Sequence, residues 1–77
     1  MKLKEGLNAV DFLERVKKCS SDVWLETDDG DRLNLKSVLS QYVFVVLSEQ
    51  KNILKAATLS CEQDDAKLLE EFLINAV

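Results

Sequence analysis

The chain has 77 residues and a formal net charge of -4, a length that predicts one small domain over residues 1–77. Its 47% apolar and 31% charged residues are typical of a globular protein and not of a disordered one. The acidic balance argues against nucleic acid as a partner. No apolar run approaches the roughly 20 residues of a membrane span, and the N-terminus lacks the apolar region of a secretory signal. We therefore expect a cytoplasmic protein with no membrane contact.

The first predicted helix covers residues 8–19, where apolar residues recur at helical spacing and charged residues occupy the other face. Asn8 is expected to be its N-cap, since its side-chain oxygen can accept a hydrogen bond from an amide of the first turn. A β-hairpin then follows over residues 23–35. Apolar and polar side chains alternate in both arms, and the Asp29-Gly30 pair between them readily adopts the positive φ angles of a tight turn. Trp24 falls on the face opposite Leu25, where it either marks a partner surface or is packed by loop residues.

The second half of the chain is harder to divide because it contains no proline and little glycine. A short helix is expected to begin near Ser37. The apolar run 42–47 (YVFVVL) is either a buried strand or the buried end of that helix, and we expect it in the core. Residues 51–52 predict a turn and residues 53–59 a strand. A final helix follows residues 63–65, with its apolar stripe at Ala66, Leu69, Phe72, Leu73 and Ala76. Helices interspersed with antiparallel strands predict an α+β two-layer sandwich.

The residues that enzymes use for chemistry are mostly missing. The chain contains no histidine for acid–base catalysis near neutral pH, and its two glycines cannot form a phosphate-binding loop. Cys19 and Cys61 cannot complete a four-ligand zinc site by themselves, and we interpret them as ordinary thiols. The acidic residues 28, 29 and 31 are expected at a solvated hairpin tip. We therefore predict no enzyme activity, no catalytic residue, no metal and no cofactor.

Residues 21–26 (SDVWLE), the Asp29-Gly30 turn and residues 33–39 (LNLKSVL) resemble the central hairpin and regulatory-serine segment of the HPr (histidine-containing phosphocarrier) family. The close similarity covers about 19 residues, and gapped similarity extends over most of the chain. The resemblance implies the family fold, a βαββαβα sandwich whose antiparallel sheet, in strand order 1-4-2-3, is covered on one face by three helices.

HPr proteins carry a phosphoryl group on a histidine at the start of the first helix, in a motif that reads GLHARP. Residues 6–11 here read GLNAVD, which puts Asn8 in place of the histidine. An amide nitrogen cannot accept a phosphoryl group, because its lone pair is delocalised into the carbonyl. A second alignment puts Glu5 there instead. Both alignments remove the phosphoacceptor, as in the catabolite-repression subgroup of the family, which lacks the histidine yet keeps the serine.

The two alignments differ over the first strand, which is either squeezed into residues 1–6 or absent. In the family's strand order this strand covers the edge of the predicted strand 53–59. If it is short or missing, the backbone groups of that edge are open to pairing with another chain. A homodimer through this exposed edge is therefore one hypothesis.

The resemblance makes Ser37 the regulatory phosphorylation site, and a phosphoserine at a helix N-terminus is stabilised by the helix dipole and amides. The alternative is that Ser37 only caps the helix through its hydroxyl. Val38, Leu39 and Tyr42 match the family's partner surface, unless some of them only close the core. The resemblance thus implies a non-catalytic regulatory or protein-interaction domain with protein partners from sugar phosphotransfer and carbon catabolite control. The alternatives are a phosphotransfer component that uses Glu5, Ser37 or a cysteine, and a diverged structural domain.

Overall fold

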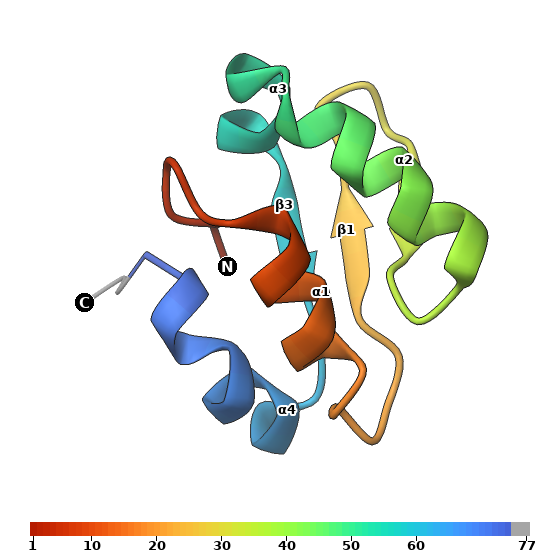
Figure 1. The fold of residues 1–77 in the computed structure, drawn as a ribbon, viewed down its shortest axis with the longest axis vertical. Helices are drawn as coiled ribbons and strands as arrows, with labels where there is room; N and C mark the ends of the chain where they lie inside the picture. Colours follow the sequence, from red (N-terminus) through yellow and green to blue (C-terminus); the bar gives the residue numbers. More distant parts are fainter. Residues whose placement is uncertain (75–77) are drawn as a thin grey trace.

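The computed structural model describes residues 1–74 and has an α+β fold, as expected (Figure 1). The described residues form four α-helices, one 3₁₀ helix and a three-stranded antiparallel sheet. In chain order these are α1 (Ala9–Val16), β1 (Trp24–Glu26), β2 (Arg32–Asn34), α2 (Val38–Ser48), α3 (Lys51–Ala56), β3 (Thr58–Ser60), α4 (Gln63–Leu69) and the 3₁₀ helix η1 (Glu70–Phe72). Within residues 1–74, no helix is long and apolar enough to cross a bilayer.

The first helix begins as predicted. Asn8 is the N-cap of α1, and its side-chain Oδ1 accepts a hydrogen bond of 3.0 Å from the amide of Asp11. The helix ends at Val16 rather than at residue 19. Beyond it, the amide of Cys19 donates to the carbonyl of Val16, three residues back, so the last predicted residues form a tighter turn. The buried face of α1 carries Phe12, Leu13 and Val16.

The predicted hairpin is present, and β1 forms the centre of the sheet, in the order β2-β1-β3. Leu25 is fully buried and lies opposite Leu33 on one side and Leu59 on the other. The turn differs from a two-residue turn, because the amide of Thr27 donates to the carbonyl of Asp31 around a three-residue loop. Gly30 has a φ of 90°, which suits the left-handed position that ends such a loop.

The apolar run 42–47 lies within α2, so of the two alternatives the helix is correct. The expectation that this run belongs to the core is wrong for most of it. Only Phe44 is buried, whereas Tyr42 and Val46 are among the exposed apolar residues. The reason is geometric: a strand between two layers buries both faces, but a helix at the surface buries only one.

The segment after α2 also differs from the prediction. Residues 51–52 do not form a turn but begin α3, and the strand predicted over residues 53–59 is limited to β3. Leucine, lysine and alanine, which dominate α3, are all good helix formers. An apolar stretch this short does not distinguish a strand from a helix by its spacing.

The predicted first strand is only a short N-terminal arm, which is hydrogen-bonded to other parts of the chain on two sides. Met1 and Leu59 exchange two backbone hydrogen bonds, of 3.1 and 2.7 Å, so the arm lies along the free edge of β3. Leu3 forms an antiparallel bridge with Leu73, next to the bond of 2.8 Å from the amide of Lys4 to the carbonyl of Phe72. The edge that the homodimer hypothesis needs is therefore occupied at Leu59 by the chain's own first residue.

Helices α1, α2 and α4 lie over one face of the sheet, and their buried side chains form the core together with it (Figure 1). The centre of the core is aromatic. The ring of Phe12 lies 5.2 Å from that of Phe44 on α2 and 5.4 Å, edge to face, from that of Phe72 on η1. Of the predicted stripe of the final helix, Leu69 and Leu73 are buried, whereas Ala76 lies outside the described residues.

Candidate functional site

The candidate site begins at Ser37, which is exposed at the N-cap position of α2. The turn before it is held by side chains on both sides. Asn34 Oδ1 accepts a hydrogen bond of 3.1 Å from the amide of Lys36, and Gln41 Nε2 donates one of 3.0 Å to the carbonyl of Leu35. These contacts fix the entrance to α2. Ser37 is thus held at a defined position at the surface.

The hydroxyl of Ser37 does not cap the helix. It makes no capping hydrogen bond to the first-turn amides of α2, in contrast to the side chain of Asn8 at α1. The expectation that Ser37 acts only as a conventional cap is therefore wrong. An acceptor group placed on this hydroxyl would lie next to amides for which the described side chains provide no cap.

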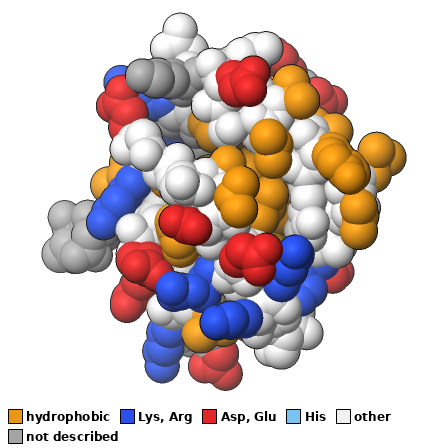
Figure 2. All heavy atoms as spheres, in the orientation of Figure 1, with side chains coloured by type: hydrophobic (Ala, Val, Ile, Leu, Met, Phe, Trp, Pro, Cys, Tyr) orange, Lys and Arg blue, Asp and Glu red, His pale blue; other side chains and the backbone are white. Residues whose placement is uncertain are grey.

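The three predicted partner-surface residues lie on the exposed side of α2. Val38 is 66%, Leu39 73% and Tyr42 70% exposed, so none of them closes the core. Val46 continues the same face one turn beyond Tyr42, and Val43 and Val45 flank it with smaller exposure. Figure 2 shows apolar side chains gathered on the side of the molecule where α2 lies. We call Val38, Leu39, Tyr42, Val43, Val45 and Val46 the α2 apolar face.

The two residues that the sequence alignments put at the acceptor position lie on other elements. Asn8 is exposed at the start of α1, and its carboxamide oxygen is used by the cap described above. Glu5 is exposed in the turn that precedes α1. The structure thus groups Ser37 with the α2 apolar face and leaves Asn8 and Glu5 on a separate segment.

The two cysteines are poorly placed for nucleophilic chemistry. Cys19 is buried in the core, and Cys61 packs against the core with partial exposure. Burial raises the pKa of the Cys19 thiol, and the nearby carboxylate of Asp65 raises it further. Burial also raises the pKa of Cys61. Because the thiolate is the reactive form, both thiols are less reactive at neutral pH than a cysteine in an unfolded chain.

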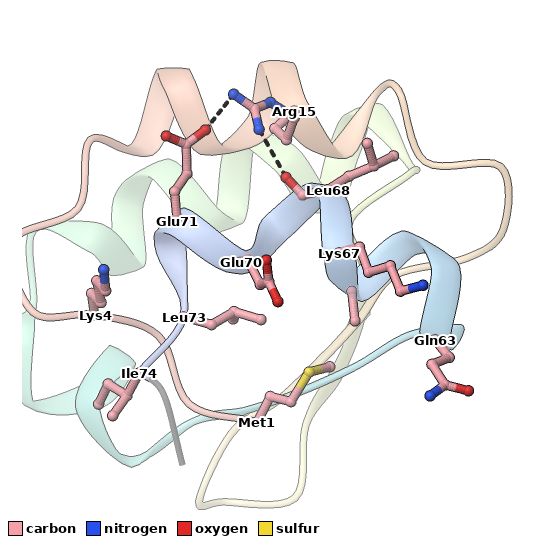
Figure 3. A pocket seen from close by; sticks show the side chains of 11 residues that line it. Met1, Lys4, Arg15, Gln63, Lys67, Leu68, Glu70, Glu71, Leu73 and Ile74 are labelled. Atoms are coloured by element: carbon pink, nitrogen blue, oxygen red, sulfur yellow. Dashed lines mark hydrogen bonds and ion pairs between the residues drawn. The ribbon is translucent and has the colours of Figure 1, made fainter. Parts of the chain in front are cut away.

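A shallow groove of about 860 Å³ is lined by residues of the N-terminal arm, α4 and η1 (Figure 3). Its lining mixes apolar side chains such as Met1 and Leu73 with charged ones such as Lys67 and Glu70. Arg15 reaches it from α1, but its guanidinium is engaged by the carboxylate of Glu71 and the carbonyl of Leu68. None of the residues predicted from the sequence as site residues lines this groove.

Trp24 lies on the sheet face opposite Leu25 and is half-buried. The guanidinium of Arg32, on the neighbouring strand, lies 4.5 Å from the centre of the indole ring. The carboxylate of Glu26 lies 3.7 Å from the same guanidinium. A neighbouring strand's side chain therefore covers this ring in part, which is a sufficient structural role for it.

The sequence alone assigned Asp65 no role beyond its place among residues 63–65, before the predicted final helix. The side chain is buried and accepts hydrogen bonds of 3.0 Å from the amide of Ser20 and 2.9 Å from the amide of Ser21. These bonds hold the pKa of the Asp65 carboxyl below its usual value, with the Ser20 amide contributing most. No spacing in the sequence links residue 65 to residues 20 and 21, so only the packing of α4 against α1 reveals the contact.

Comparison with models of protein families, with curated proteins and with solved structures finds no significant match to this chain.

Proposed function

We propose that this chain is a non-catalytic, HPr-like regulatory or protein-interaction domain, related to the sugar phosphotransferase system and carbon catabolite control. The observation that carries the proposal is the position of Ser37. It stands exposed at the N-terminus of α2, directly before the exposed side chains of Val38 and Leu39. A phosphoryl group on Ser37 would change the charge at the end of a partner-binding surface, which is an effective arrangement for a switch.

The arrangement of the sheet supports the relation to HPr. With the N-terminal arm beside β3, the order across the sheet is arm, β3, β1, β2. This corresponds to the order 1-4-2-3 that the resemblance implies, and α1, α2 and α4 pack on one side of it. The additional helix α3 and the reduced first strand are departures from the family pattern.

The absence of histidine removes the usual carrier chemistry. One alignment puts Asn8 at the acceptor position, where its amide cannot take a phosphoryl group, and the other puts Glu5 there in place of a histidine. The raised pKa values of Cys19 and Cys61 weigh against a thiol acceptor. The function proposed here therefore works through the surface of a cytoplasmic protein and not through transfer of a phosphoryl group.

The modification is tested by incubating the chain with ATP and the Ser kinase of the HPr family, followed by mapping of the phosphate by mass spectrometry. We expect one phosphate on Ser37 and none on the Ser37→Ala variant, while Ser40→Ala, on the first turn of the same helix, is phosphorylated normally. Phosphate that persists in Ser37→Ala would contradict the assignment.

Carrier activity is tested separately with phosphoenolpyruvate and the family's enzyme I. We expect no phosphate on the chain under these conditions. An acid-labile phosphate that the chain passes on to a sugar-transport protein would overturn the non-catalytic function and support the alternative acceptors.

Binding is tested by titrating the Ser37-phosphorylated chain with the family's catabolite-control regulator in a calorimeter. Leu39→Glu, in the α2 apolar face, should weaken binding at least ~10-fold, because it places a charge in an apolar contact. Val10→Glu adds the same charge on α1 and should have little effect. If the regulator fails to bind, or both variants bind equally well, this partner is wrong.

A further inference from the structure

The α2 apolar face is larger than the fold requires. Phe44 alone is buried on the inner side of the helix, yet Val38, Leu39, Tyr42 and Val46 are each more than half exposed on the outer side. On α1, by contrast, charged residues occupy most of the outer side, as is usual for a helix at the surface of a protein. An apolar outer face on one helix but not on the other indicates that this face is covered by something else.

The distribution of charge limits what can cover this face. Residues 37–48 contain no charged residue, although 31% of the chain is charged. In a symmetric contact between two identical copies, a charge near the twofold axis would meet its own copy, and a charge elsewhere in the patch would be buried against apolar side chains. An uncharged patch avoids both costs. The rest of the molecule carries the net charge of -4, so two copies repel one another less through α2 than elsewhere.

The spacing of the exposed residues is also suited to a symmetric contact. Tyr42, the largest of them, lies at the centre of the stripe. Val38 and Leu39 lie four and three residues before it, and Val45 and Val46 lie three and four residues after it. Two α2 helices that cross antiparallel at Tyr42 would therefore place the first pair of one copy against the second pair of the other.

We propose that two copies of this chain associate through the α2 apolar face, with their α2 helices antiparallel about a twofold axis at Tyr42. The contact is confined to one side of an 11-residue helix, roughly 16 Å long and about 10 Å wide, so it buries less than the ~800 Å² per partner of a standard interface. The dimer is therefore weak and reversible. It uses the surface of the proposed regulatory contact but does not depend on that function, and binding of a protein partner there would compete with it.

The test is sedimentation equilibrium of the purified chain alone, from about 5 μM to 1 mM. We expect a monomer at the low end and a dimer at the high end. Val46→Glu should raise the dimer dissociation constant at least ~10-fold, because two charges would be buried in the contact. Val10→Glu is the matched control. It changes the same residue type, of nearly equal exposure (62% against 59%), on α1 instead of α2, and it should leave the constant within about 2-fold.

The orientation is tested with Tyr42→Glu and Tyr42→Lys. Each variant alone should be monomeric, because two like charges would meet at the twofold axis, and an equal mixture of the two should form dimers. Circular dichroism confirms that each variant is folded.

A single-chain mass at all concentrations, an unchanged dimer in Val46→Glu, or a mixture that stays monomeric would overturn the proposal. A dimer that survives these changes would instead point to the edge of the sheet. Because only the chain itself is measured, these results are independent of whether a regulator binds.

Discussion

Asp65 and Ser20, which are 45 residues apart in the sequence, are joined by two hydrogen bonds. The Asp65 carboxylate accepts one of 3.0 Å from the Ser20 amide and one of 3.3 Å from the Ser20 hydroxyl. It thereby holds the loop between α1 and β1 against α4. Without Asp65 the amides of this partly buried loop would lose these partners, and an amide shielded from water without a partner is costly.

We expect Asp65→Asn to lower the thermal midpoint by several degrees, because the amide group is neutral and has only one acceptor oxygen. The pH dependence gives a sharper test. The pKa of Asp65 is lower in the folded chain than its ordinary value of 3.8, so its contribution to stability is full above that value. The contribution is lost as the pH falls through the lowered folded pKa.

The measurement is urea unfolding from about pH 2 to about pH 7, a range that includes the ordinary aspartate pKa of ~3.9. As the pH falls below the ordinary aspartate pKa, the free energy of unfolding should decrease more steeply for the wild type than for Asp65→Asn. The control is Asp64→Asn, which removes the same charge from an exposed position on the same helix. Equal acid profiles for the wild type and Asp65→Asn would contradict the assignment.

The two helix N-caps should respond differently to alanine. Asn8→Ala removes a side-chain cap and should cost about 1 kcal/mol of unfolding free energy. Ser37→Ala removes a hydroxyl that caps nothing and should cost less than about 0.5 kcal/mol. Chemical denaturation followed by the fluorescence of Trp24, the only tryptophan, measures both. If Ser37→Ala cost as much as Asn8→Ala, Ser37 would be a conventional cap in solution.

Phe12 should be the most sensitive apolar position of α1, because it is fully buried between the rings of Phe44 and Phe72. Phe12→Ala should cost about 3–5 kcal/mol. A domain of this size has a total stability of roughly 4–12 kcal/mol, so this loss would be at least about a quarter of the whole. Leu39→Ala, on the exposed α2 apolar face, should change stability by no more than about 0.5 kcal/mol. Similar losses for the two variants, measured by urea unfolding, would contradict the assigned burial.

The thiols should react slowly in the folded chain. Burial raises the pKa of both cysteines above the ordinary value of 9.0, so less thiolate is present at pH 7 and the rate should still be rising above pH 9. Cys61, which is partly exposed, should react with a disulfide reagent before the buried Cys19. The single variants Cys19→Ser and Cys61→Ser assign the two rates. A fast reaction at neutral pH would reopen the possibility of a thiol acceptor.

Local patterns in the sequence were sufficient to predict the elements that begin or end at a characteristic capping or turn residue. Asn8 is followed by an amphipathic stretch, and alternation around Leu25 is followed by a turn with Gly30 at positive φ. In both cases the signal and the structure involve neighbouring residues. The candidate site was predicted in the same way, since Ser37, Val38, Leu39 and Tyr42 belong to one helix and its cap.

The tertiary structure decided what neighbouring residues could not. An apolar run such as residues 42–47 has the same composition whether it is buried or exposed, and only the position of α2 at the surface left Val46 in contact with solvent. The position of the N-terminal arm depends on the free edge of β3, because an arm this short has no stable conformation without a strand to pair with. Asp65 is the clearest case: its charge is evident in the sequence, but its partners are backbone amides, which any residue could supply.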